Sequence, residues 1–377
     1  MKIGITCYPS IGGSGVIATE LGILMAERGH EVHFITSNMP FRLNKPIPNI
    51  TFHQVDVNQY AVFQYPPYDI SLSTKIANVI NEYDLDLLHM HYAIPHAICG
   101  ILARQMSGKD IKIMTTLHGT DITVLGYDHA LRNAIKFGIE QSDVVTSVSE
   151  SLKDETYEII KPNKAIVPIY NFVRESEFPT GYNSELKASY GIAEDEKVII
   201  HVSNFRKVKR IDTIIDTFHH IRQQTKAKLL LIGDGPELLD MREKVRDLDL
   251  LDDVLFLGKQ DCVSNFYQIS DLVLLMSEKE SFGLTLLEAM TTGVAPIGTR
   301  AGGIQEVIRH GETGYLVNVG DSEKAAHYAL KLLSDETLYK TLQQNMLKDV
   351  KQRFHSSIIA DQYESHYRQM IGAADDE

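Results

Sequence analysis

The chain has 377 residues, of which 44% are hydrophobic and 23% charged, which is ordinary for a globular protein and long enough for two domains. Its net charge of −13 argues against nucleic acid as a partner and against stable membrane association, because both call for a basic face. Cys7, Cys99 and Cys262 have neither disulfide nor metal spacing, and no apolar run is long enough to span a bilayer.

Short runs rich in β-branched residues alternate with amphipathic helical stretches, which predicts parallel sheets with crossover helices. The chain opens on a strand and not on a signal peptide, so we expect a cytoplasmic protein. The first helix is the stretch VIATELGILMAERG, which ends at Gly29. Strands of the first half are predicted to begin at Lys2, Glu31, Ile50, Leu85, Lys112, Asp143 and Ala165.

The pattern breaks between residues 171 and 196, where the sequence is polar and turn-rich, and we interpret this segment as a linker. The fold class predicted is α/β, with a Rossmann-like domain at 1–170, a second at 171–357, and a C-terminal helix of about 358–377 that packs back on the first. Ligands of such sheets bind beyond the carboxyl ends of the strands, so we expect the site in a cleft that both domains face. Strands of the second half are predicted to begin at Lys197, Ala227, Val254, Leu272, Ala295 and Gly314.

A glycine-rich turn, Gly12 to Gly15, lies between the first strand and the first helix. Glycines at this place let backbone N–H groups approach an anion at the helix N-terminus. The turn matches neither GxGxxG nor a P-loop, so a tight turn without a ligand is the alternative interpretation.

A second candidate anion site follows the strand at Leu272, where Glu280 is followed eight residues later by Glu288. The N–H groups of a helix N-terminus suit an anion, while carboxylates suit neutral hydroxyls, so a diphosphate flanked by a hexose and a ribose meets both demands. A capping glutamate and a surface glutamate are the alternative. The turn and the start of the helix are formed by Glu280, Ser281, Phe282, Gly283 and Leu284.

Four cations also gather within five positions, at Arg206, Lys207, Lys209 and Arg210. A solvated loop is the alternative to a phosphate-binding role. Two DxD pairs, at Asp84 and Asp86 and at Asp247 and Asp249, are predicted to face solvent, and we expect neither an essential metal nor a cofactor.

The segments ESFGLTLLE, GVAPIGTRAGGIQEVI and GETGYLV together resemble the GT4 family of retaining glycosyltransferases, which has the GT-B fold. The resemblance covers the whole chain, including the GGSG turn, the HGTD segment from His118 and the GDGPE turn from Gly233. It implies that a nucleotide sugar is a substrate.

The resemblance also implies individual roles. Glu280 is implied to hold the donor-sugar hydroxyls, Glu288 the ribose hydroxyls, and the N–H groups of Gly13 and around Gly283 the diphosphate. Lys209 matches the family's phosphate lysine, and His118 is implied to lie beside the anomeric carbon. The chain departs from the family at Asn204, where an arginine is usual, and Arg206 is our candidate replacement.

Features of the acceptor site follow from another departure. Arg174 stands where the family often has an acid, and its planar fork favours an anionic acceptor, although an exposed linker arginine is the alternative. His89 and His91 alternate along one strand without a third partner at ligand spacing, so they do not predict a metal site. The residues expected to offer hydroxyl and amide contacts to a small acid are Ser14, Tyr92, Thr120 and Asn171.

The segments SNFRKVKRID, YNFVRES and MHYAIPHA resemble one branch of the family, which implies UDP-N-acetylglucosamine as donor, L-malate as acceptor and a place in bacillithiol biosynthesis. Since no carboxylate matches a double-displacement nucleophile, we expect front-face substitution with a phosphate oxygen as base. The alternatives are a transferase with another acceptor, such as an inositol phosphate, a sugar phosphate or a lipid, a UDP-N-acetylglucosamine epimerase, and a non-catalytic sensor. The sequence does not determine the oligomeric state, so a homo-oligomer stays an open alternative.

Overall fold

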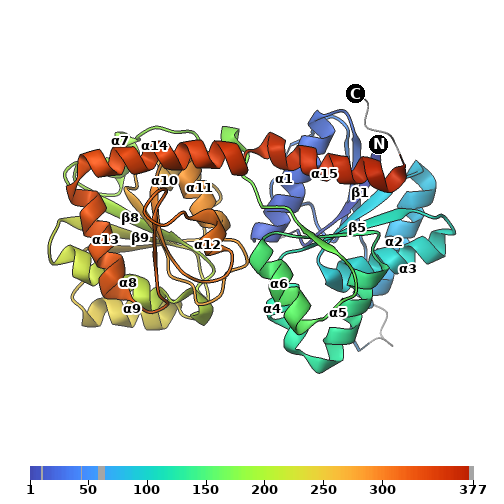
Figure 1. The fold of residues 1–377 in the computed structure, drawn as a ribbon, viewed down its shortest axis with the longest axis horizontal. Helices are drawn as coiled ribbons and strands as arrows, with labels where there is room; N and C mark the ends of the chain where they lie inside the picture. The colour runs from blue at the N-terminus through green and yellow to red at the C-terminus, as the bar shows by residue number, and fades with distance from the viewer. Residues whose placement is uncertain (10–11, 44, 58–63, 373–377) are drawn as a thin grey trace. The chain divides into compact units, whose positions relative to one another are not determined.

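The computed structural model describes residues 1–9, 12–43, 45–57 and 64–372, which form two compact units (Figure 1). The first unit is Met1–Asn171 with Ser356–Glu377, and the second is Phe172–His355. The chain therefore leaves the first unit after residue 171 and returns to it at residue 356. No helix within the described ranges combines the length and apolar character that crossing a membrane requires.

The first unit is built on a seven-stranded parallel sheet in the order β3-β2-β1-β4-β5-β6-β7. The strand order reverses between β1 and β4, and a doubly wound sheet binds its ligand beside that point. The strands are β1 (Lys2–Thr6), β2 (Glu31–Thr36), β3 (Ile50–Gln54), β4 (Leu87–His91), β5 (Lys112–Leu117), β6 (Val144–Ser147) and β7 (Ile166–Pro168).

The helices of this unit cover the sheet, and the last one comes from the far end of the chain. Figure 1 draws α15 in red along the blue α1, and Arg28 after α1 donates to Glu364 of α15 at 2.9 Å. The helices are α1 (Gly13–Glu27), α2 (Tyr68–Tyr83), η1 (Ala93–Ala97), α3 (Ile98–Ser107), α4 (Thr120–Thr123), η2 (Leu125–Tyr127), α5 (His129–Gln141), α6 (Glu150–Ile159) and α15 (Ser356–Ile371).

The second unit repeats the design with six parallel strands in the order β10-β9-β8-β11-β12-β13, and its order reverses between β8 and β11. Its strands are β8 (Lys197–Val202), β9 (Ala227–Ile232), β10 (Val254–Gly258), β11 (Leu272–Leu275), β12 (Ala295–Thr299) and β13 (Tyr315–Val317). Its helices are η3 (Glu175–Glu177), α7 (Ser184–Ser189), η4 (Lys207–Lys209), α8 (Ile211–Arg222), α9 (Leu238–Asp247), α10 (Ser264–Tyr267), α11 (Leu284–Thr292), α12 (Ile304–Val307), α13 (Ser322–Ser334) and α14 (Glu336–Arg353).

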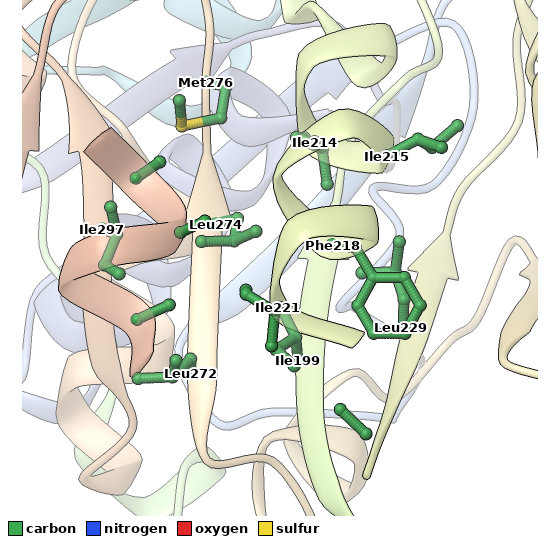
Figure 2. Close-up of a cluster of buried hydrophobic side chains, with 14 of the residues drawn as sticks. Ile199, Ile214, Ile215, Phe218, Ile221, Leu229, Leu272, Leu274, Met276 and Ile297 are labelled. Atoms are coloured by element: carbon green, nitrogen blue, oxygen red, sulfur yellow. The ribbon is translucent and has the colours of Figure 1, made fainter. Parts of the chain in front are cut away.

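The core of the second unit lies between the sheet and α8, as Figure 2 shows. The apolar face of α8 comes from residues three or four apart, Ile211, Ile214, Ile215 and Phe218, all buried. They pack with the strand residues Ile199, Leu229, Leu272, Leu274 and Ile297, so the central strands that lead into the loops at the carboxyl ends are buried.

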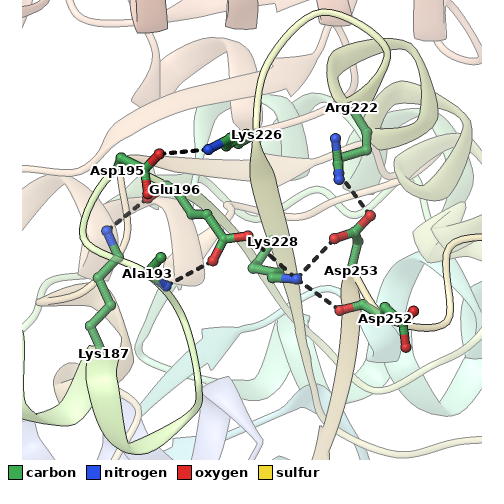
Figure 3. A network of polar contacts seen from close by, with 9 residues as sticks. All are labelled: Lys187, Ala193, Asp195, Glu196, Arg222, Lys226, Lys228, Asp252 and Asp253. Atoms are coloured by element: carbon green, nitrogen blue, oxygen red, sulfur yellow. Dashed lines mark hydrogen bonds and ion pairs between the residues drawn. The ribbon is translucent and has the colours of Figure 1, made fainter.

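A network of ion pairs lies at the amino-terminal ends of the strands of this sheet (Figure 3). The ammonium of Lys228 lies 2.9 Å from Asp253 and 3.4 Å from Glu196, and its side chain is only 15% exposed. Arg222 completes the network with a 2.7 Å contact to Asp253. These ion pairs tie the starts of β8, β9 and β10 together, and they lie away from the carboxyl ends where ligands bind.

The predicted linker at 171–196 is wrong as a description of this segment. From Phe172 onward it belongs to the second unit, contains η3 and α7, and buries four apolar side chains. Its turns surround these buried residues, so the polar and turn-rich composition concealed a packed segment, whose buried side chains are Phe172, Val173, Phe178 and Ile192.

Candidate functional site

The predicted site residues fall into two clusters, one on each unit, and each follows strands beside a point where the strand order reverses. In the first cluster α1 begins at Gly13 after an extended Gly12 (φ −68°, ψ 156°), which has no side-chain cap. Both glycines are exposed. A fifteen-residue helix with an uncapped, exposed N-terminus offers backbone N–H groups and the positive end of its dipole to an anion.

Tyr92 links the loop after β4 to this helix. Its hydroxyl donates to Ser14 Oγ at 2.9 Å, and the side chain of Thr120 is near enough to act on its pKa. Burial raises the pKa of Tyr92 to about 12, so the phenol stays protonated and able to donate. The structure therefore brings together three of the four residues predicted to contact an acid.

Asn171, the fourth, is the last residue of the first unit before the chain crosses to the second. It is 7% exposed, and its Oδ1 is buried with no hydrogen-bond partner among the described residues. An unsatisfied buried amide oxygen is costly, and a ligand hydroxyl would satisfy it.

His118 lies at the end of β5, with its Nε2 2.8 Å from Nδ1 of His91 and its ring 5.2 Å from that of Tyr92. Burial lowers the pKa of His118 to about 3, and the neighbouring His96 adds to the shift. His118 is therefore neutral at physiological pH and a weak base.

Asp121 holds the loops that carry these side chains, a role that the sequence analysis missed. Its Oδ1 accepts the N–H groups of His118 at 3.3 Å and Gly119 at 3.0 Å, and its Oδ2 accepts that of Ala93 at 3.1 Å. One buried carboxylate thus ties the turn after β4 to the turn after β5. Burial raises the pKa of Asp121 to about 6 against the effect of these hydrogen bonds, so it is ionised at neutral pH.

The second cluster begins after β11, and its two glutamates lie where their spacing predicted. Glu280 is on the loop, Gly283 adopts φ +98° at the start of α11, and Glu288 is in the second turn of that helix. A φ in this region favours glycine. Phe282 is buried and stacks edge-to-face on Phe354, so only its backbone is available to a ligand.

A buried tyrosine holds Glu288. The Tyr267 hydroxyl lies 3.1 Å from Glu288 Oε2, and Glu288 is only 7% exposed. Burial and the adjacent carboxylate raise the pKa of Tyr267 well above its usual value, so the phenol remains a donor. This pair was not predictable from local sequence patterns, because the two residues are twenty-one positions apart.

Lys209 and Glu280 form an ion pair, with Nζ 2.6 Å from Oε2. This ion pair joins the loop after β8 to the loop after β11. Of the other clustered cations, Arg210 makes two 3.1 Å hydrogen bonds to Asp212. Arg206 and Lys207 are exposed, and neither side chain has an ion pair among the described residues.

Four glycines allow the loops of this cluster to approach one another. A Cβ on Gly303 would lie 2.4 Å from the Ser281 carbonyl oxygen, and one on Gly302 would lie 2.1 Å from that of Glu280. The GDGPE turn is equally close to the loop after β8, because a Cβ on Gly233 would lie 1.8 Å from the Ser203 carbonyl oxygen. These motifs were recognised in the sequence, but their structural role comes only from the packing. Gly235 makes a similar approach to Phe205.

Within the described ranges, no group of three or more His, Cys, Asp or Glu side chains is arranged to hold a metal ion. The two DxD pairs are exposed as predicted. Asp84 pairs with Lys109 at 2.6 Å, and Asp86 accepts the backbone N–H of Lys2 at 2.7 Å.

Comparison with known proteins identifies the family. Residues 11–177 match the model described as Glycosyltransferase Family 4, and residues 183–349 match that of Glycosyl transferases group 1. An N-acetyl-alpha-D-glucosaminyl L-malate synthase of Bacillus anthracis is 58% identical over 98% of this chain and 97% of its own. The chain belongs to glycosyltransferase family 4. A second relative, an uncharacterized glycosyltransferase of Methanocaldococcus jannaschii, is 26% identical over 98% of each chain.

Solved structures identify the fold of this family 4 glycosyltransferase as GT-B. Sucrose-phosphate synthase of Thermosynechococcus elongatus superposes with a TM-score of 0.83 at 21% identity, over 99% of this chain and all of the other. Anabaena HepE, solved in complex with UDP and glucose, superposes with a TM-score of 0.82 at 21% identity, over 97% of this chain and 99% of its own. The prediction of two Rossmann-like domains in a GT-B glycosyltransferase is confirmed.

Proposed function

We propose that the protein transfers N-acetylglucosamine from UDP-N-acetylglucosamine to the hydroxyl of L-malate, with retention at the anomeric carbon, in bacillithiol biosynthesis. The observation that carries this proposal is the 58% identity, over nearly the full length of both chains, to a synthase whose name states this product. A relative at 26% identity supports only the family.

The donor is proposed to bind the second unit. The N–H groups at the start of α11 and Lys209 after β8 suit a diphosphate, and Glu288, oriented by Tyr267, suits the two ribose hydroxyls. Glu280 would accept hydroxyls of the sugar. The Lys209–Glu280 ion pair supports this arrangement, because it places a cation and a carboxylate side by side, as a phosphate next to a hexose requires.

Charge stabilisation is the main catalytic effect in this proposal. Cleavage of the sugar–phosphate bond leaves negative charge on the β-phosphate, and Lys209, with Arg206 as a second candidate, would neutralise it. Cations and N–H groups that are already in place need no reorganisation during the reaction, which is why such groups lower the barrier. No metal is needed in this scheme.

L-Malate is proposed to contact Ser14, Tyr92, Thr120 and Asn171, with Arg174 pairing one of its carboxylates. Tyr92 and Ser14, which are joined by a hydrogen bond, and the nearby Thr120 supply hydroxyl donors, and the Asn171 oxygen, which has no partner among the described residues, supplies an acceptor for a hydroxyl. An arginine is suited to a carboxylate because its planar fork makes two parallel hydrogen bonds.

The reaction is proposed to be a front-face substitution. The malate hydroxyl attacks from the side on which the diphosphate leaves, its oxygen bonds to the anomeric carbon, and its proton passes to a phosphate oxygen. A neutral His118 with a pKa of about 3 is a poor general base, which favours the phosphate oxygen for that step.

UDP release with a panel of acceptors tests the proposed function. L-Malate should accelerate release from UDP-N-acetylglucosamine far above the rate with water, and mass spectrometry should find the sugar–malate conjugate. L-Lactate, which has the hydroxy acid but only one carboxylate, is the matched control and should be much poorer. Equal rates with malate and water would refute the proposal, and preference for an inositol phosphate would replace the acceptor.

A further inference from the structure

His91 and His118 share one hydrogen bond, and the surrounding contacts indicate which of the two nitrogens carries the proton. Nδ1 of His91 and Nε2 of His118 lie 2.8 Å apart, which is hydrogen-bond distance, so one proton lies between them. Burial lowers the pKa of both imidazoles, of His91 well below 6.5 and of His118 to about 3. Both rings are therefore neutral near pH 7, and each carries a single N–H.

Two arrangements are consistent with this count. If His118 donates from Nε2, His91 carries its own proton on Nε2, and this nitrogen is completely buried and has no hydrogen-bond partner among the described residues. If His91 instead donates from Nδ1, its Nε2 carries no proton, and only an acceptor is left unpaired there. A buried N–H without an acceptor is the rarer case in proteins, so the second arrangement is favoured.

The neighbouring histidines do not change this result. His96 Nδ1 lies 2.5 Å from the carbonyl oxygen of His91, and a carbonyl only accepts, so His96 is the donor there and its Nε2 is bare. His89 stacks on His91 with ring centres 4.2 Å apart and bonds in-plane to Thr116 and Tyr367. Neither neighbour offers a partner to Nε2 of His91.

The other nitrogen of His118 faces a different environment. Nδ1 of His118 has no protein partner among the described residues, and it is not one of the buried unpartnered atoms, so it keeps access to solvent. The protonation of Nδ1 therefore decides whether His118 donates or accepts a hydrogen bond when a ligand binds there.

We propose that His91 is a positioning residue that fixes His118 as the Nδ1–H tautomer, so that His118 offers the bound sugar nucleotide a hydrogen-bond donor and not an acceptor. This inference rests on the proposed function only in placing His118 beside the donor. An N–H donor there suits an oxygen of the sugar or of the departing diphosphate. It also removes Nδ1 as a base, since its lone pair is already protonated.

The matched variants are His91→Asn and His91→Leu. The Asn side-chain nitrogen stands at about the position of imidazole Nδ1 and can still donate, whereas Leu has a similar shape without a donor. Both remove the imidazole ring, and Asn leaves more of its volume unfilled than Leu does, so a loss caused by packing alone would be larger in His91→Asn, which is the opposite of the order that the donor predicts. Thermal unfolding and circular dichroism establish that each variant is folded.

Nitrogen-15 NMR of histidine-labelled protein without substrate measures the tautomer, and His118→Gln assigns the resonances. Wild type and His91→Asn should show His118 protonated at Nδ1 and bare at Nε2, while His91→Leu should lose that preference. A wild-type spectrum with the His118 proton on Nε2 overturns the proposal, as does a His91→Leu spectrum identical to wild type.

Steady-state kinetics then connect the tautomer to catalysis. His91→Leu should lower kcat roughly tenfold with little change in UDP affinity, because only part of the population keeps the productive donor, and His91→Asn should recover most of that loss. Equal losses in both variants overturn the positioning role. If the wild-type protein transfers sugar to an acceptor other than malate, the proposed acceptor fails while the spectra still decide the tautomer.

Discussion

Gly303→Ala is expected to impair donor binding and catalysis from outside the set of residues proposed to touch substrate. Gly303 lies beneath the Glu280–Gly283 turn, and its N–H donates to the Glu280 carbonyl at 3.0 Å. An added Cβ would lie 2.4 Å from the Ser281 carbonyl oxygen and 2.7 Å from Phe282 Cα. Both neighbours are backbone atoms, so the turn itself must move.

The size of the movement follows from these distances. Ordinary van der Waals contact of a Cβ begins near 3.4 Å, so the Ser281 carbonyl must retreat by about 1 Å from its present 2.4 Å. A misplacement of about 1 Å in a catalytic arrangement can cost about 10²-fold in rate. Overpacking should also lower the free energy of unfolding by about 1–3 kcal/mol.

Calorimetric titration with UDP and kcat/KM for the transfer reaction measure the effect. Gly100→Ala is the control, because the atoms nearest its Cβ belong to the flexible Met90 side chain at 3.1–3.2 Å and alanine suits the interior of α3. We expect a large loss for Gly303→Ala and little for the control. A folded Gly303→Ala protein with wild-type UDP affinity and turnover would refute the reasoning.

Three further substitutions test single residues. Lys209→Met should lower kcat by about 10²-fold or more, whereas Lys207→Met, at an exposed neighbouring cation, should be near normal. Equal losses would contradict the phosphate role. Arg174→Ala should raise KM for L-malate about tenfold or more with the KM for the donor unchanged, and two unchanged KM values would remove Arg174 from the site. Burial tends to raise the pKa of Glu364, but hydrogen bonds from Arg28, Arg368 and His30 outweigh it and hold this pKa at about 2. The contribution of Glu364 to stability is therefore present above pH 4.5 and is lost as the pH falls toward 2. Glu364→Gln should therefore flatten the dependence of the urea midpoint on pH in that window, and an unchanged slope would contradict this.

The strands were the most predictable part of the fold. Each run of β-branched residues that was assigned as a strand contains one in the structure, because buried parallel strands need continuous apolar runs that few other elements share. The segment after Asn171 was misjudged because its contacts are distant in the sequence: Val173 forms a bridge with His355, and the buried Phe178 packs on Tyr267. Turn-forming residues between them gave the stronger local signal.

The candidate site likewise contains residues that could be predicted from the sequence and residues that could not. Glu280 and Glu288 were found because their spacing places one on a loop and the other on the helix that follows. Asp121 and Tyr267 were not, because their importance lies in which distant groups they contact, and one sequence does not record such contacts. The glycine motifs were recognised by resemblance, and their close backbone approach gives them a physical reason.

The proton NMR spectrum of the product made from UDP-N-acetylglucosamine and L-malate tests the proposed transfer most directly. We expect one N-acetylglucosamine joined to the malate hydroxyl oxygen, with the anomeric proton showing the small coupling of an α linkage, as in the donor. A β-linked conjugate, or free N-acetylglucosamine with unmodified malate, would contradict retaining transfer to this acceptor.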